Sequence, residues 1–182
     1  MVVYTSYIVK RVSAMSKIPV VDGDIFASDA KIIIHQVNCK GKMNSGVAKQ
    51  VREKYPIVFT HYKSWCDDES RNPKHFERSP LLGQAQIVYI EDKKVDNVLS
   101  CDRIIVNLFS QDGYGYDGKC YTNYVSMRKG LQSIAEQFSK EDEIGIPYLI
   151  GCCRGGGDWN IVSSMIEEIF DGYNVTFYKY KG

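Results

Sequence analysis

Four segments of the chain combine glycines with polar side chains that could bind or transform an anionic ligand. The longest runs from His35 to Ala48 (HQVNCKGKMNSGVA) and connects a predicted strand to a predicted helix. A loop that opens onto a helix N-terminus offers unpaired N–H groups and the positive end of the helix dipole, which suits phosphate. Gly41 and Gly46 would let the backbone approach such a ligand closely. The segment matches neither the P-loop pattern nor the G-x-G-x-x-G dinucleotide fingerprint.

A second glycine-rich loop, Gly151–Trp159 (GCCRGGGDW), separates another predicted strand from a predicted helix. Three successive glycines cost backbone entropy on folding, and close approach of the backbone to a ligand would explain them. The alternative is a loop that is merely flexible. Arg154 could bind phosphate through two parallel hydrogen bonds, or it could be a solvated side chain. Asp158 could cap the helix that follows, or it could orient a water molecule.

Two shorter segments follow other predicted strands. In Asp22–Ile25 (DGDI) an aspartate held by a glycine turn could accept hydrogen bonds from an amino group, although glycine and aspartate also favour ordinary turns. In Asn107–Tyr116 (NLFSQDGYGY) a buried strand ends in Ser110 and Gln111, and a loop rich in glycine and tyrosine comes next. An ordinary turn with aromatic packing is the alternative there.

His35 is the side chain in these segments best suited to catalysis. An imidazole titrates near neutral pH and can act as a base or as a nucleophile towards phosphate. The residue follows three isoleucines, so the alternative is a half-buried histidine whose ring is satisfied by a backbone carbonyl.

Short apolar runs rich in β-branched residues alternate along the chain with helical patterns of apolar residues. This alternation predicts an α/β fold, a three-layer α/β/α sandwich around a central mixed, mostly parallel sheet. Ligands bind such sheets outside the carboxyl ends of the strands, where all four segments lie. The predicted strands are 18–21, 32–37, 86–90, 104–109, 144–150 and 174–180, and the predicted helices are 47–54, 57–66, 122–139 and 159–170.

Length and composition fit one domain. The 182 residues are 44% apolar and 25% charged, and the net charge of +1 gives no sequence-independent attraction to nucleic acid or to anionic membranes. The six cysteines show no metal-ligand spacing, so we expect free thiols and no metal site. We expect a monomer in the cytoplasm, or in the nucleus of a eukaryotic cell. Residues 1–14 would form an extension or an edge strand, and residues 15–182 the domain.

Taken together and in order, the four segments resemble the macro domain family, which binds ADP-ribose. The motifs are G-D-I after the first strand, N-C-x-G-x-M-x-x-G-x-A, the strand N-L-F-S-Q, and G-C-x-x-x-G-G-D-W before a helix, and the match covers roughly Ile18 to Tyr180. The resemblance implies that Asp24, assisted by the Ile25 amide, holds the adenine amino group and that Asn38 touches the distal ribose. It implies two loops around the diphosphate, and it places Tyr178 or Tyr180 beside the adenine. The remaining residues that we assign to ligand binding are Gly41, Asn44, Ser45, Gly46, Val47, Ser110, Gln111, Cys153, Arg154, Gly155, Gly156 and Gly157.

Within the family, the chain is most similar to the branch of ADP-ribose-1″-phosphate phosphatases and of the terminal ADP-ribose protein glycohydrolase. The phosphatase resemblance makes His35 a catalytic residue. Independently of the resemblance, we assign Asp158 a catalytic role as a carboxylate that orients water near the distal ribose. The glycohydrolase has lysine and aspartate where this chain has Gln111 and Gly155, which argues against lysine-dependent cleavage. We therefore expect a hydrolase of ADP-ribose-1″-phosphate that needs no cofactor. A reader of ADP-ribose without turnover, and a hydrolase of O-acetyl-ADP-ribose or of ADP-ribosylated macromolecules, are the alternatives.

Overall fold

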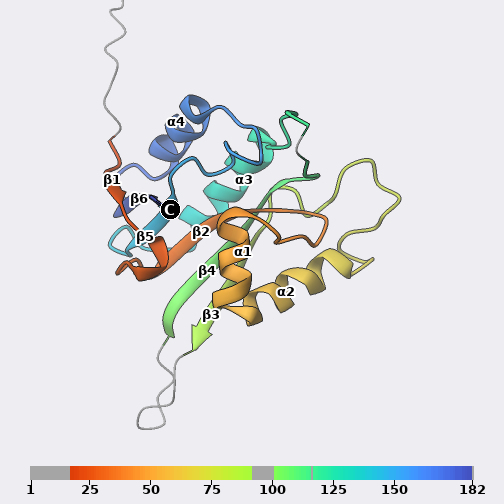
Figure 1. The fold of residues 1–182 in the computed structure, drawn as a ribbon, viewed down its shortest axis with the longest axis horizontal. Coiled ribbons are helices and arrows are strands. Elements are labelled where there is room, and N and C mark those ends of the chain that lie inside the picture. The colour runs from red at the N-terminus through yellow and green to blue at the C-terminus, as the bar shows by residue number, and fades with distance from the viewer. Residues whose placement is uncertain (1–16, 92–100, 116, 182) are drawn as a thin grey trace, which may run out of the picture.

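A single six-stranded sheet with helices on both of its faces forms the fold (Figure 1). The computed structural model describes residues 17–91, 101–115 and 117–181. The segment 1–14, predicted as an extension or an edge strand, lies outside the described residues. The elements are β1 (Val20–Asp22), the 3-10 helix η1 (Ile25–Ala27), β2 (Ile32–Asn38), α1 (Gly46–Lys54), α2 (Pro56–Asp67), β3 (Ala85–Glu91), β4 (Cys101–Gln111), α3 (Tyr124–Ala135), β5 (Ile144–Pro147), α4 (Trp159–Ile169) and β6 (Val175–Lys179).

The strands are ordered β1-β6-β5-β2-β4-β3. Only β3 pairs with its neighbour in the antiparallel sense, so the described sheet is mixed and mostly parallel, as predicted. The parallel strands β2, β4 and β5 lie next to one another, and their carboxyl ends therefore meet at one edge of the sheet. The segments that follow these three strands are brought together there.

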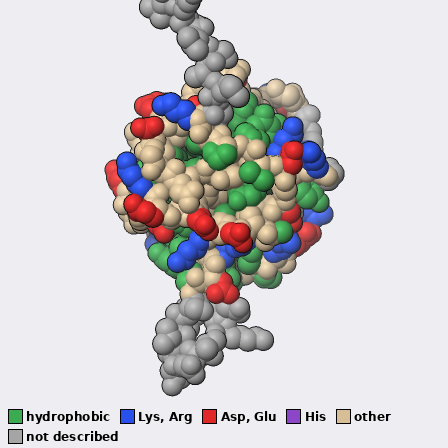
Figure 2. Space-filling model, turned by 90° about the vertical axis from the view of Figure 1, so that its left-hand side faces the viewer, with side chains coloured by type: hydrophobic (Ala, Val, Ile, Leu, Met, Phe, Trp, Pro, Cys, Tyr) green, Lys and Arg blue, Asp and Glu red, His purple; other side chains and the backbone are tan. Residues whose placement is uncertain are grey.

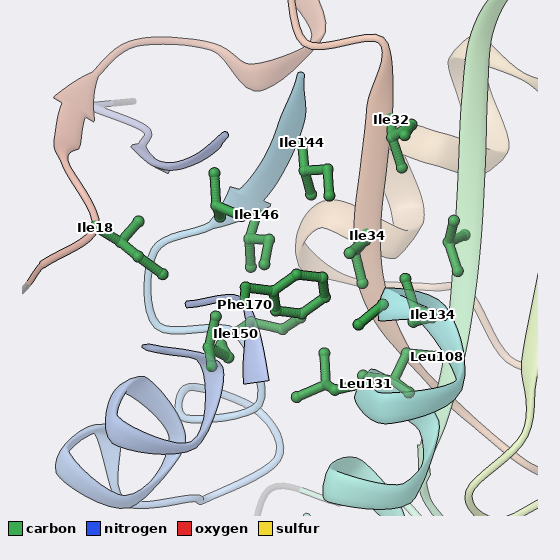
Figure 3. Packing of buried hydrophobic residues seen from close by; sticks show 14 of the residues in the cluster. Ile18, Ile32, Ile34, Leu108, Leu131, Ile134, Ile144, Ile146, Ile150 and Phe170 are labelled. Carbon is green, nitrogen blue, oxygen red and sulfur yellow. The ribbon is translucent and has the colours of Figure 1, made fainter. Parts of the chain in front are cut away.

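The isoleucines of β2 explain why both faces of the sheet are covered. Ile32 and Ile34 pack into a cluster with residues of α3 and α4, and Figure 3 shows this packing. Ile33 points to the opposite face and packs into a cluster with Val51 of α1 and Val58 of α2. All three isoleucines are fully buried. Successive side chains of a strand alternate between faces, so a continuous apolar run requires two covering layers and gives the predicted three-layer sandwich.

The helices begin where local hydrogen bonds allow them. Asn123 caps α3, because its Oδ1 accepts a hydrogen bond from Ser126 N at 2.9 Å. The predicted helix 122–139 is therefore too long at its start, and it also ends earlier, at Ala135. Pro56 occupies the first turn of α2, where its missing N–H costs nothing, and it separates α2 from α1.

The predicted strand 144–150 is wrong in its second half. β5 ends at Pro147, and the chain then makes consecutive turns in which Ile150 N donates to Pro147 O at 3.0 Å. Leu149 adopts a φ of 62°, which a continuing strand does not allow. Ile150 packs back into the core and is 5% exposed. The second half of the apolar run 144–150 is therefore apolar because Ile150 is buried after a turn, and not because it pairs as a strand.

The surface of the described part mixes both signs of charge. Figure 2, which faces the side of the molecule that carries β1 and β6, shows Lys, Arg, Asp and Glu side chains around the periphery and apolar side chains nearer the centre. All six cysteines are free, as expected: Cys39 and Cys66 are buried, whereas Cys120 and Cys153 are exposed. Among the described residues, no helix combines the length and the apolar composition that crossing a membrane requires.

Gly130 sets how closely α3 packs against β4. A Cβ at this position would clash with Cδ1 of Leu108, a side chain that is fully buried. We expect Gly130→Val to lower the free energy of unfolding by about 1–3 kcal/mol through overpacking. The exposed Ser133 on the same helix gives the control, since Ser133→Ala should change stability by less than about 0.5 kcal/mol. Urea denaturation of both variants measures the effect, and equal stabilities would contradict the packing argument.

Candidate functional site

A cleft of about 310 Å³ opens at the carboxyl ends of β2, β4 and β5. This is where the fold class predicts a ligand site. Three of the four segments singled out in the sequence contribute to its wall. The lining residues are 35–38, 42, 44–48, 111, 114–115, 147–151 and 153–155.

The first wall is the N-terminus of α1. Ser45 precedes the helix without forming a side-chain cap, and the first helical residues line the cleft. Gly46 has a φ of 57°, and a Cβ there would meet no atom within 4 Å. The backbone N–H groups of the first helical turn have no partner within the helix, so this end is suited to an anion. The prediction for Gly46 agrees with this geometry.

Asn38 organises the loop that leads to α1. Its Nδ2 donates to Lys42 O at 2.6 Å, while its Oδ1 accepts from Lys40 N at 2.9 Å and from Lys42 N at 3.3 Å. The hydroxyl of the buried Tyr62 lies 2.8 Å from Asn38 O and 3.0 Å from Asn38 Oδ1. The side chain lines the cleft, yet its hydrogen bonds within the protein make it first a scaffold for the loop.

The second wall is the loop after β5, and a buried polar network fixes it in place. Gln36 Nε2 donates to Ser110 Oγ and to Thr122 Oγ1, each at 3.0 Å. Thr122 Oγ1 in turn donates to Gly151 O at 2.7 Å, and Gly157 N donates to the same carbonyl at 2.9 Å. The network joins the ends of β2 and β4 to the loop, and so it sets the distance between the two walls.

Packing within the protein explains the three successive glycines better than ligand contact does. A Cβ on Gly155 would clash with Thr122 Oγ1 and Gly151 O. A Cβ on Gly156 would lie 2.6 Å from Lys119 O, and Gly156 also has a φ of 67°. Only Gly155 of the three lines the cleft. Loop packing thus accounts for the glycines, and the expectation that all three allow a ligand to approach stays a prediction.

The charge of the cleft is positive. Lys42 and Arg154 are the cationic side chains among its described lining residues, and that lining contains no Asp or Glu. Because the chain as a whole carries only +1, this bias is local. No group of three or more His, Cys, Asp or Glu in the described part of the chain could hold a metal ion. The cleft is therefore suited to an anionic organic ligand.

His35 lies in the floor of the cleft and is almost fully buried. The side chain is 1% exposed, and its Nε2 lies 2.7 Å from Asn107 Oδ1. Since Asn107 Nδ2 donates to Gln86 Oε1 at 2.9 Å, the Asn107 oxygen accepts the proton of Nε2, which leaves Nδ1 as an unprotonated, buried and unpartnered nitrogen. Burial lowers the pKa of His35 to about 4, so the ring is neutral at pH 7. The catalytic role of His35 stays a prediction that these contacts do not favour.

The predicted acids also lie away from the cleft lining. Asp158 caps α4, since its Oδ1 accepts from Asn160 N at 2.8 Å. Asp24 caps η1 through Phe26 N at 2.9 Å, and it lines a second groove together with Tyr178. Their ligand roles stay predictions. The predicted residues that line the cleft are His35, Asn38, Asn44, Ser45, Gly46, Val47, Gln111, Cys153, Arg154 and Gly155, and those outside its lining are Asp24, Ile25, Gly41, Ser110, Gly156, Gly157, Asp158 and Tyr178.

Several lining residues were not predicted. Gln36 and Lys42 belong to the first segment, and strand alternation could have placed Gln36 on the face opposite His35. Tyr148 and Leu149 line the cleft because the chain turns after Pro147. The apolar run 144–150 predicts one continuous strand and so gives no sign of this turn. Tyr114 belongs to the glycine- and tyrosine-rich loop. Its position between two glycines was the sequence feature that could have indicated a lining residue.

The comparisons with known proteins agree on the fold. No protein-family model matches the chain. An ADP-ribose 1″-phosphate phosphatase of Neosartorya fischeri is 39% identical over 119 residues, which are 57% of this chain and 60% of that protein. The chain thus matches less than two thirds of the length of this relative.

Two solved structures show the same architecture. The macrodomain of Mycobacterium tuberculosis DarG has a TM-score of 0.66 at 20% identity, covering 90% of this chain and 98% of that one. Thermosipho africanus DarTG in complex with ADP-ribose has a TM-score of 0.63 at 22% identity, covering 89% of this chain and 41% of that one. The chain therefore has the macrodomain fold, and in sequence it resembles the ADP-ribose 1″-phosphate phosphatases.

Proposed function

We propose that this chain binds ADP-ribose in the cleft and hydrolyses a derivative substituted at the 1″ position, with ADP-ribose-1″-phosphate as the preferred substrate. One observation carries the proposal. The open N-terminus of α1 faces the Gly151–Gly155 loop across a cleft whose charged lining residues are Lys42 and Arg154. An open helix N-terminus, a glycine-rich loop and two cations in one cleft suit a diphosphate better than a single phosphate.

The two ends of the cleft differ in chemistry, which supports one orientation of the ligand. At the β5 side, Val47, Tyr148 and Leu149 offer apolar contacts for a flat base. At the β4 side, the amides of Asn38 and Gln111 lie on paired positions of β2 and β4 and suit the hydroxyls of a ribose. The adenine would therefore lie towards β5 and β6, and the second ribose towards β4.

The relatives support the choice of ligand and reaction. One relative is named an ADP-ribose 1″-phosphate phosphatase, and one structural neighbour holds ADP-ribose. A 1″-phosphate would lie at the amide end of the cleft. Lys42 belongs to this end, since its carbonyl oxygen accepts from Asn38 Nδ2. Its ammonium group would offset the charge that the third phosphate brings.

A reader of ADP-ribose without turnover is the second candidate, and one observation favours it. The described lining of the cleft contains no carboxylate, and the ring of His35 is buried and engaged with Asn107. Among the described side chains that line the cleft, the candidate general base is therefore the buried ring of His35, whose Nδ1 has no hydrogen-bond partner. Binding without catalysis needs none of these groups.

Gly46 tests the diphosphate site. We expect Gly46→Ala to weaken ADP-ribose binding about tenfold or more, because the new methyl group projects into the cleft and the residue has a positive φ. Gly118→Ala is the matched control, since Gly118 also has a positive φ, of 74°, and its Cβ would also meet nothing within 4 Å, but it lies outside this cleft. Isothermal titration calorimetry measures both affinities. If Gly46→Ala binds ADP-ribose as tightly as the parent, the α1 N-terminus does not hold the diphosphate.

Lys42 tests the phosphatase activity. Incubation with ADP-ribose-1″-phosphate should release inorganic phosphate, and Lys42→Met should lower kcat/KM roughly tenfold by removing a cation at the 1″ end. Lys49→Met, an exposed lysine of α1 outside the cleft lining, should leave kcat/KM unchanged. Tight binding of ADP-ribose with no turnover of any 1″-linked derivative would instead establish the reader.

His35 contributes a pH dependence to stability whose sign follows from its pKa. The folded pKa of about 4 lies below the ordinary value of 6.5, so the unfolded chain binds the proton first as the pH falls. Stability is fully present above pH 6.5 and is lost towards pH 4, by roughly 2–3 kcal/mol between pH 7.5 and 4.5. His35→Gln keeps a donor for Asn107 but does not titrate. Between pH 7.5 and 4.5 its free energy of unfolding, measured by urea denaturation, should therefore fall by roughly 2–3 kcal/mol less than that of the parent. Equal losses in the two proteins would mean that folding does not lower the pKa of His35.

A further inference from the structure

Tyr121 supports a part of the cleft wall that is separate from the N-terminus of α1 and from the loop after β5. The loop after β4 packs two glycines against its ring, since a Cβ on Gly113 would lie 3.2 Å from Tyr121 Cδ1 and Cε1. A Cβ on Gly115 would lie 2.9 Å from Tyr121 Cζ and would clash with the hydroxyl. The same hydroxyl donates to Asp117 Oδ1 at 3.0 Å. The ring therefore fixes the backbone on both sides of Tyr114.

The backbone of Tyr121 is attached to the opposite wall. Tyr121 N donates to Gly155 O at 2.8 Å, and the next residue, Thr122, donates to the same carbonyl at 2.9 Å. Gly155 belongs to the loop that lines the cleft after β5. Tyr121 thus connects the loop after β4 with the loop after β5, although it is not itself among the lining residues.

Tyr114 is the aromatic residue that this arrangement presents to the cleft. It lies between the two glycines that contact Tyr121, it lines the cleft beside Gln111, and its side chain is 52% exposed. An aromatic face that is held by the backbone and left open to solvent suits contact with the apolar face of a sugar ring. Its place at the end of β4 is the amide end of the cleft, where the proposed orientation puts the second ribose.

We propose that Tyr114 contacts the second ribose of the ligand and that Tyr121 is the positioning residue that holds Tyr114 there. The inference rests on the proposed function, because it assigns a specificity residue to that same cleft. Tyr114 then distinguishes ADP-ribose from ADP, which has the same adenosine and diphosphate but lacks the second ribose.

Calorimetric titration with ADP-ribose and with ADP tests the contact. Tyr114→Ala should weaken ADP-ribose binding roughly tenfold and leave ADP binding unchanged. Tyr89→Ala is the matched control, because Tyr89 is 59% exposed but lies on β3 outside the cleft lining. It should bind both nucleotides as the parent does.

Tyr121→Leu tests the positioning role. The variant should weaken ADP-ribose binding in the parent chain and cause no further loss in the Tyr114→Ala background, since its effect passes through Tyr114. Additive losses, or an equal loss of ADP affinity, would show a general effect on the cleft and would overturn the positioning role. If the parent binds both nucleotides and Tyr114→Ala changes neither affinity, the contact is refuted while the proposed function stands. If the parent binds neither nucleotide, both proposals fail.

Discussion

The hydrogen bond from Gln36 to Thr122 is the interaction on which the cleft depends. Gln36 lies on β2, in the interior of the sheet, and donates to Thr122 Oγ1. Thr122 Oγ1 in turn donates to Gly151 O at the start of the second loop. Together with the backbone hydrogen bonds from Tyr121 and Thr122 to Gly155 O, this connection holds the loop after β5 against the ends of β2 and β4. Backbone N–H groups hold an anion well only when their positions are set before it binds. A buried side-chain network is a rigid way to set them, because each partner left unsatisfied would cost free energy.

The same requirement explains where the chain uses glycine. Gly46 gives an open approach to the cleft from the helix, whereas Gly155 and Gly156 allow the second loop to pack against Thr122 and Lys119. Gly113 and Gly115 let another loop pack against Tyr121. Glycine at a ligand site therefore has two distinct uses here. One exposes the backbone to the ligand, and the other brings protein segments close enough to build the walls.

The sequence predicts the architecture well, because its strongest patterns are local. The isoleucines of β2 require cover on both faces, and the apolar periodicity after Asn123 and Asp158 gives α3 and α4. The turn after Pro147 could not be read in this way. Tyr148, Leu149 and Ile150 continue the apolar composition of a strand, and only the tertiary packing of Ile150 decides that the chain turns.

The site was predicted as a set of segments more successfully than as a set of side chains. Glycines before helices indicated two loops at one edge of the sheet, and both line the cleft. The orientation of single side chains depends on register and on partners far along the chain. His35 faces Asn107 on the neighbouring strand, and Gln36, one residue later, reaches Ser110 and Thr122. No local sequence pattern predicts which residues these side chains contact.

The central claim, that the cleft between α1 and the loop after β5 binds the diphosphate of ADP-ribose, is tested most directly by the backbone amide resonances of the protein in solution. Titration of isotope-labelled protein with ADP-ribose should shift the amide signals of residues 46–48 and 153–155 most strongly, because their N–H groups would donate to the phosphates. Shifts confined to the groove beside Asp24 and Asp29, with residues 46–48 and 153–155 unchanged, would contradict the account.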